Sequence, residues 1–145
     1  MRSRTRFLVI PPAIALLAAC ASARLHQQGL DAVEQGNYEV GLRQLAQAVA
    51  GEPGNLTYRL DLQGRRDEAV QKLIADGDRA RGAGDLDGAA KTYQRVLSIE
   101  NTNERARKGV DAVAADRRHA ALIGRAQEEF KSGRYDQAAR AATSF

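Results

Sequence analysis

The sequence predicts an all-α protein built from a repeated helical hairpin. A turn signal recurs three times, starting at Gly36, Gly84 and Gly133, and each glycine is followed two residues later by a large apolar residue. The glycines are 48 and 49 residues apart, and a near-constant period of this size is typical of stacked helical repeats. Proline is also scarce: of three prolines, two fall in the first twelve residues. Little interrupts a helix after that point.

Each turn signal is expected to end one helix and to begin the next. Glycine accepts the left-handed conformation that the C-terminus of a helix often needs. The next residue is expected to cap the second helix in two copies, through Asn37 and Asp85, whereas Arg134 cannot do so. An apolar residue then packs back on the first helix, and a small residue three positions later allows close approach. These pairs are Tyr38 and Gly41, Leu86 and Ala89, and Tyr135 and Ala138.

Long first helices are predicted between the hairpins. The first hairpin is expected to pair a helix from about Leu25 to Gln35 with one over 38–50, where apolar residues recur at helical spacing. Residues 56–83 and 104–132 contain no proline and are each expected to form one helix, unless Gly64 and Gly109 split them. The expected inner faces are Leu62, Ala69, Val70, Leu73, Ile74 and Ala80 in the first, and Ala106, Val110, Val113, Leu122, Ile123 and Phe130 in the second.

The N-terminal residues have the pattern of a targeting signal. Arg2, Arg4 and Arg6 precede an apolar run over 7–19, whose thirteen residues are too few to span a bilayer as a mature anchor. The run ends in Leu17, Ala18, Ala19 and Cys20, which resembles the lipobox of bacterial lipoproteins at all four positions.

This resemblance has four implications. Residues 1–19 are a signal peptide that is removed, the Cys20 thiol carries diacylglycerol, the new amine is acylated, and residues 20–24 form a lipidated linker. Because Ala21 and not Asp follows the cysteine, the resemblance to Gram-negative lipoproteins also implies sorting to the outer membrane, with the domain facing the periplasm. Several acyl chains hold a protein durably, because each buried methylene contributes about 0.8 kcal/mol.

Other roles for Cys20 are harder to support. It is the only cysteine, so one chain can form neither a disulfide nor a zinc cluster with it. A catalytic thiol needs a base, and the only histidines are His26 and His119. An ordinary secretory signal cut after Ala19 or Ala21, with Cys20 incidental, remains an alternative.

Composition and motifs argue against catalysis and nucleic-acid binding. Without the first nineteen residues the chain has 19 basic and 18 acidic side chains, which is no electrostatic footprint for nucleic acid. No phosphate-binding loop, metalloprotease motif or nucleophile elbow is present, so no catalytic residue, metal site or cofactor is predicted beyond the lipid on Cys20. Two charged groups are read as solvated helix faces: Asp76, Asp78, Asp85 and Asp87, with one of them a helix cap, and the basic run Arg117, Arg118 and His119.

The hairpins resemble tetratricopeptide repeats. The first matches the family's spacing at Leu25, Gly29, Gly36, Tyr38, Gly41, Leu45, Ala48 and Pro53. The second matches at Leu73, Gly77, Ala80, Gly84, Leu86, Ala89, Tyr93 and Val96, with Asn101 in place of the proline. The third matches at Leu122, Ala126, Gly133, Tyr135 and Ala138. The family's usual period is about 34 residues, so these hairpins with long first helices are a variant of it.

The resemblance implies that residues 25–145 are one repeat region, with an incomplete third hairpin, that binds protein and does not catalyse a reaction. A lipobox followed by long-helix repeats also resembles the front of lipoprotein-type secretins, the general secretion pathway protein D type. The expected function is therefore a scaffold for a protein partner in a secretion or pilus-type envelope assembly, with no small-molecule substrate. The alternatives are a stand-alone lipoprotein for envelope assembly and an accessory region of an envelope enzyme.

Overall fold

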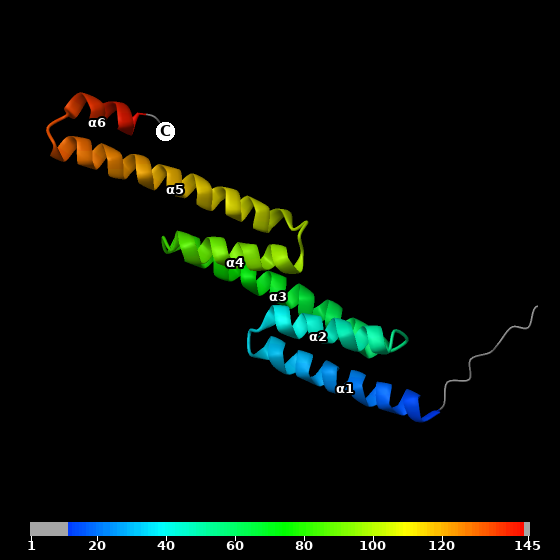
Figure 1. Ribbon diagram of the computed structural model, residues 1–145. Helices are drawn as coiled ribbons and strands as arrows, with labels where there is room; N and C mark the ends of the chain where they lie inside the picture. Colours follow the sequence, from blue (N-terminus) through cyan, green and yellow to red (C-terminus); the bar gives the residue numbers. More distant parts are fainter. Residues whose placement is uncertain (1–11, 144–145) are drawn as a thin grey trace, which may run out of the picture. The chain divides into compact units, whose positions relative to one another are not determined.

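The computed structural model describes residues 12–143, and these form helices joined by short turns, with no strand among them. The helices are α1 (Pro12–Glu34), α2 (Tyr38–Gly51), α3 (Leu56–Gly82), α4 (Leu86–Ile99), α5 (Glu104–Lys131) and α6 (Tyr135–Ala142) (Figure 1). The all-α prediction is confirmed. The chain divides into two compact units, one ending at Ala69 and the other beginning at Val70, and each is described by itself.

Three glycine turns join consecutive helices by the same hydrogen-bond pattern. Gly36, Gly84 and Gly133 have φ angles of 79°, 81° and 73°, and no other described residue has a positive φ. At the first turn, the Gly36 amide donates to the Val33 carbonyl and the Asn37 amide to the Ala32 carbonyl, each at 2.9 Å. The same two bonds recur around Gly84 and Gly133. This pairing is the Schellman motif, which closes a helix on a residue in the left-handed conformation.

The side-chain caps differ from the prediction. Asp85 caps α4 by accepting from the Gly88 amide at 2.9 Å, and Arg134 makes no side-chain cap. Asn37 was expected to cap α2, but its side chain makes no such bond. Asn103, which follows none of the three turn glycines, does cap α5 by accepting from the Ala106 amide at 2.9 Å. All three turns therefore depend on the glycine conformation, whereas a side-chain cap on the second helix is present only at the turn that contains Asp85.

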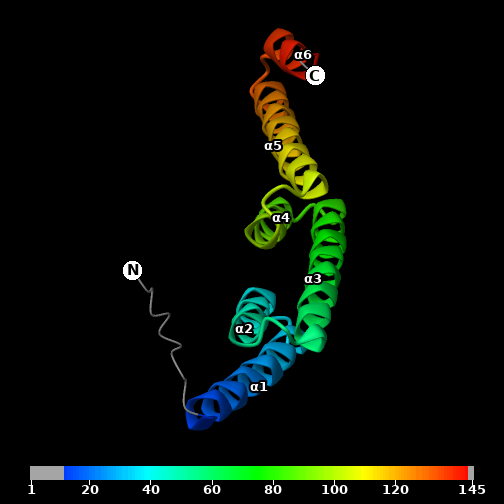
Figure 2. The same ribbon diagram turned by 90° about the vertical axis from the view of Figure 1, so that its right-hand side faces the viewer.

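In the first unit, α1 and α2 pack closely as a hairpin (Figure 2). A Cβ atom added to Gly41 would lie 2.6 Å from Val33 Cγ2 and 2.7 Å from the Gly29 carbonyl oxygen. The two backbones can meet only because both positions lack a side chain. Leu45 and Ala48, both fully buried, complete the apolar side of α2.

The helix α1 begins earlier than expected. The predicted start was about Leu25, after a linker over 20–24, but α1 already includes these residues and Cys20 is exposed on it. Ser22 is only 3% exposed, because its side chain lies against Gly51 at the end of α2. Small residues at 18–23 suit a helix as well as a linker. The basic residues of the targeting signal lie outside the described part of the chain.

Both long helices are continuous, as expected. Gly64 lies within α3 and Gly109 within α5, and neither divides its helix. The predicted inner face of α3 is largely buried: Ala69, Val70, Leu73 and Ile74 are each at most 4% exposed. On α5 the prediction holds for the first half, where Ala106 and Val113 are buried. In the second half, Ile123 and Phe130 line the surface between α5 and α6, but they are 47% and 63% exposed and not buried.

Candidate functional site: an apolar groove between α5 and α6

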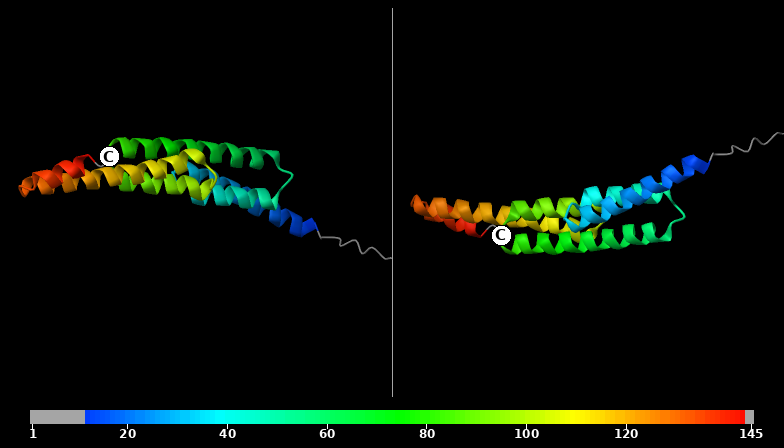
Figure 3. Two further views of the ribbon diagram at one scale, coloured as in Figure 1. Left: turned by 90° about the horizontal axis from the view of Figure 1, so that it is seen from above. Right: turned by 90° about the horizontal axis from the view of Figure 1, so that it is seen from below.

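The second unit contains two hairpins that can be compared directly. The second hairpin (residues 70–99) joins the last part of α3 to α4, and the third hairpin (residues 119–142) joins the last part of α5 to α6. Helix α6 packs antiparallel against α5 (Figure 3). Helix α5 serves both hairpins, because its first half also packs against α4.

Tyr93 is the centre of the second hairpin. It is 1% exposed and forms a buried cluster with Ala89 of α4 and Val113 of α5. A Cβ atom added to Gly77 of α3 would lie 2.8 Å from the ring, and one added to Gly109 of α5 would lie 2.6 Å from it. The ring therefore fits between two helices only because each has a glycine at the point of contact.

Charged side chains surround this ring. The Tyr93 hydroxyl donates to Asp78 Oδ1 at 2.6 Å, and Arg105 Nη2 donates to Asp78 Oδ2 at 2.6 Å. The hydrogen bond from Tyr93, and then Arg105, hold the pKa of the Asp78 carboxyl below its usual range. Burial, and then the bond to Asp78, raise the pKa of Tyr93 to about 12. Every oxygen of the cluster has a partner, so its role is to fix α5 on the hairpin.

Two further ion pairs attach α5 to this hairpin. Arg81 donates to Asp116 at 2.6 Å, and Arg117 pairs with Asp87. Asp78, Asp87 and Arg117 are solvated as predicted, with side chains 45%, 84% and 48% exposed, but their ion pairs with another helix were not predicted. No spacing signal could have shown this, because the partners are about thirty residues apart in sequence: 27 for Arg105 with Asp78 and 30 for Arg117 with Asp87.

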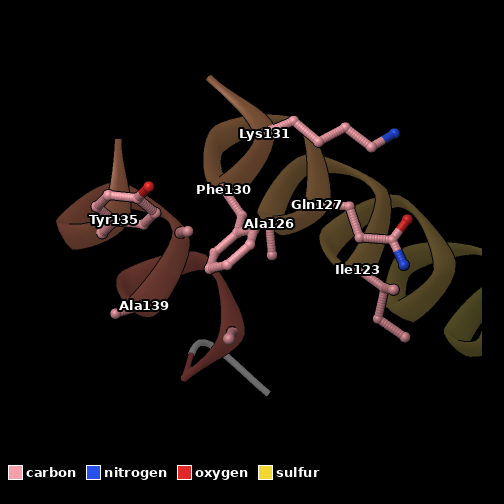
Figure 4. Close-up of a pocket in the computed structure, with 9 residues that line it drawn as sticks. Ile123, Ala126, Gln127, Phe130, Lys131, Tyr135 and Ala139 are labelled. Atoms are coloured by element: carbon pink, nitrogen blue, oxygen red, sulfur yellow. The ribbon is translucent and has the colours of Figure 1, made fainter. Parts of the chain in front are cut away.

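The third hairpin has an open apolar groove instead. The groove has a volume of about 830 Å³ and lies between α5 and α6 (Figure 4). Two polar residues, Gln127 and Lys131, are among those that line it. The others are apolar: Ile123, Ala126, Phe130, Tyr135, Ala138, Ala139 and Ala142.

Two aromatic side chains form one end of this groove. The rings of Phe130 and Tyr135 meet edge to face with their centroids 5.3 Å apart, as expected for a tyrosine that packs back on the first helix. Each residue is nevertheless 63% exposed. Phe130 extends from α5 toward α6 (Figure 4), and Ala138 of α6 is buried. Large apolar residues gathered in an exposed groove are typical of a surface that binds another protein.

A histidine in the first unit makes a polar contact. His26 Nε2 lies 2.7 Å from Asp61 Oδ2, and the His26 ring stacks on Tyr58 at a centroid distance of 4.3 Å. The contact joins α1 to the first part of α3. The contact contains no thiol, and Cys20 is exposed six residues earlier on α1.

Comparison of the chain with protein-family models, with curated proteins and with solved structures gives no match. Within residues 12–143 no group of three His, Cys, Asp or Glu side chains is arranged to hold a metal ion. In the same part of the chain, no helix combines the length and the apolar character needed to cross a membrane.

Proposed function

We propose that the mature chain is a non-catalytic protein-binding scaffold, anchored by lipid to the periplasmic face of a bacterial outer membrane. Its hairpins are a long-helix variant of the tetratricopeptide repeat, of the kind that precedes the pore domain in lipoprotein-type secretins. The observation that carries the proposal is the apolar groove of the third hairpin, with Phe130 and Tyr135 each 63% exposed. Exposed aromatic anchors in a concave apolar surface favour a protein partner over a small polar substrate.

Repeated close packing supports the tetratricopeptide-like interpretation. Each hairpin has a glycine turn with positive φ and a small buried residue five positions later: Gly41, Ala89 or Ala138. Stacks of this kind provide extended surfaces for protein partners, and function resides in those surfaces.

The position of Cys20 favours an anchor close to the folded domain. Cys20 is exposed, so its thiol is accessible to modification, and Ser22 is buried against Gly51 only two residues later. A lipid on Cys20 would therefore hold α1 at the membrane without a flexible spacer. The partner would have to reach the scaffold near the membrane surface.

Metabolic labelling tests the anchor. Cells that express the full chain are grown with a clickable palmitate analogue, and the protein is analysed by mass spectrometry and membrane fractionation. We expect a lipid-modified N-terminal Cys20 in the outer-membrane fraction, and loss of label in Cys20→Ser. An unmodified mature N-terminus at Cys20 or at Ser22, the positions after Ala19 and Ala21, would show an ordinary secretory signal and overturn this part of the proposal.

Photo-crosslinking in intact cells tests the binding function. A photoreactive phenylalanine replaces Tyr135 in the groove, and the control replaces Arg118, an exposed residue of α5 that does not line the groove. We expect a discrete protein adduct from position 135 that is absent from position 118. Equal adducts at both positions, or none at either, would contradict a binding role for the groove.

A further inference from the structure

The groove of the third hairpin corresponds in sequence to a surface of the second hairpin. Gly133 follows Gly84 by 49 residues, and this offset relates the two hairpins. When 49 is subtracted from the numbers of the residues that line the groove, most of them correspond to residues in or against the buried Tyr93 cluster of the second hairpin. The pairs are Ala126 with Gly77, Tyr135 with Leu86, Ala138 with Ala89, Ala139 with Ala90, and Ala142 with Tyr93.

In the second hairpin this surface holds a helix. The first half of α5 covers it, with Val110 and Val113 packed in the cluster around Tyr93 and Gly109 against the Tyr93 ring. Arg105 and Asp116, at either end of the contact, pair with Asp78 and Arg81. The surface is therefore built to take one amphipathic helix in a defined register.

No element among residues 12–143 covers the corresponding surface of the third hairpin, where Ile123 is 47% exposed and Phe130 63%. We propose that this groove binds one amphipathic helix of a partner protein, in the register that α5 adopts on the second hairpin. The proposal rests on the binding function proposed above and specifies its partner.

The two surfaces differ at the centre, and the difference defines the partner helix. Tyr93 fills the centre of the second hairpin, which is why α5 has Gly109 there. Ala142, which lines the groove, takes that place in the third hairpin and has no ring to fill it. A helix that fits must supply the missing volume itself. It has a large apolar residue, such as leucine, where α5 has Gly109.

The charges differ as well. The positions of Asp78 and Arg81, which pair with α5, are taken by Gln127 and Phe130 in the third hairpin. A basic residue at the position of Arg105 therefore finds no carboxylate at the position of Asp78, and an acidic residue at the position of Asp116 finds the Phe130 ring in place of Arg81. The partner helix carries a neutral polar residue at the first and an apolar residue at the second, because an unpaired charge against the Phe130 ring would lose hydration.

Synthetic helices provide the test. Two dye-labelled peptides have the α5 sequence over 103–119 with Arg105→Gln and Asp116→Leu, and differ only in having Gly109→Leu or Gly109→Ala. Both residues favour helix, so helicity is matched. Binding to the purified full-length protein is followed by fluorescence anisotropy. We expect the leucine peptide to bind about tenfold or more tightly than the alanine peptide, because its larger side chain fills the groove.

Variants of the protein place the binding site. Ala142→Tyr introduces the ring that the second hairpin has at this position. It is expected to weaken binding of the leucine peptide about tenfold or more, so that the two peptides bind with similar affinity. Arg140→Tyr is the control, because the same side chain is introduced on α6 at an exposed residue that does not line the groove. It is expected to leave both affinities unchanged.

Three results would overturn the inference: no saturable binding of either peptide, equal binding of both, or equal effects of the two variants. Sedimentation of the protein alone adds a fourth. A dimer that Ala139→Glu dissociates would show that a second copy occupies the groove. If neither peptide binds but position 135 still gives a specific crosslink in cells, the proposed scaffold function stands. Only the inference that the partner is a helix is then rejected.

Discussion

The second and third hairpins have the same turn and the same small contact residue, but they bury very different amounts of their apolar surface. Gly84 and Gly133 both have positive φ, and Ala89 and Ala138 are both buried. Tyr93 is 1% exposed in the second hairpin, whereas Phe130 and Tyr135 are 63% exposed in the third. A hairpin of this type therefore closes itself only along the contact between its two helices. Its outer face needs a third helix, and in the second hairpin that helix is α5.

The comparison predicts that single truncations of tyrosine have unequal effects. Tyr93→Ala should lower the free energy of unfolding of the second unit by about 3 to 5 kcal/mol, the range for losing a large buried aromatic residue. Tyr135→Ala removes a ring of equal size but should cost about 1 kcal/mol or less, because most of that ring is already in water. Hydrogen exchange of the α4 amides measures both effects. Similar losses in the two variants would mean that the third hairpin is not open in solution.

The pH dependence of stability tests the buried tyrosine more finely. The pKa of Tyr93 is raised from 10.0 to about 12, so folding favours its protonated form. The resulting stability is fully present below pH 10 and is lost as the pH rises through 12. The stability advantage of the wild-type protein over Tyr93→Phe should therefore decline by up to about 1.4 kcal/mol for each pH unit in that window. An advantage that does not change with pH would show that the phenol is accessible to water.

The turns and the long helices could be predicted from sequence because they depend on local chemistry. Gly36, Gly84 and Gly133 are needed where φ is positive, and the absence of proline over 56–83 and 104–132 leaves α3 and α5 unbroken. The start of α1 was missed, because the small residues near Cys20 fit a linker and a helix equally well. Ser22 becomes part of the fold only through Gly51, a contact between distant positions that no local pattern contains.

The groove was harder to predict for a different reason. Ile123 and Phe130 have the helical spacing of an inner face, and sequence spacing identifies a face without showing whether anything covers it. The Tyr93 contact had a signal that was available: Gly77 and Gly109 stand on the two helices that flank one large ring. The sequence around Gly109 taken alone favours a kink, because a lone glycine in a helical sequence more often suggests a break.

Glycine substitutions within one helix should change stability in opposite directions. Gly109→Ala adds a Cβ atom 2.6 Å from the Tyr93 ring, so it should destabilise the second unit by about 1 to 3 kcal/mol through overpacking. Gly124→Ala, also in α5, meets nothing within 4 Å and should stabilise by about 0.5 to 1 kcal/mol, because alanine favours helix. Urea unfolding followed by circular dichroism gives the sign of each. A gain in both variants would show that α5 does not press on Tyr93.

The smallest expected effect concerns an ion pair present in one hairpin and missing from the other. Arg105 pairs with Asp78, and their side chains are 62% and 45% exposed, so Arg105→Gln should cost about 1 kcal/mol or less in the free energy of unfolding. The loss should shrink in high salt, because an exposed pair is screened. Gln127 takes the place of Asp78 in the third hairpin, where no described residue corresponds to Arg105. Gln127→Asp should therefore change stability only through a local pair with Lys131, four residues later on α5, by a few tenths of a kcal/mol. If Gln127→Asp stabilised the protein by more than this in low salt, a basic group other than Lys131 would lie against the groove, and the neutral partner helix inferred for it would have the wrong charge.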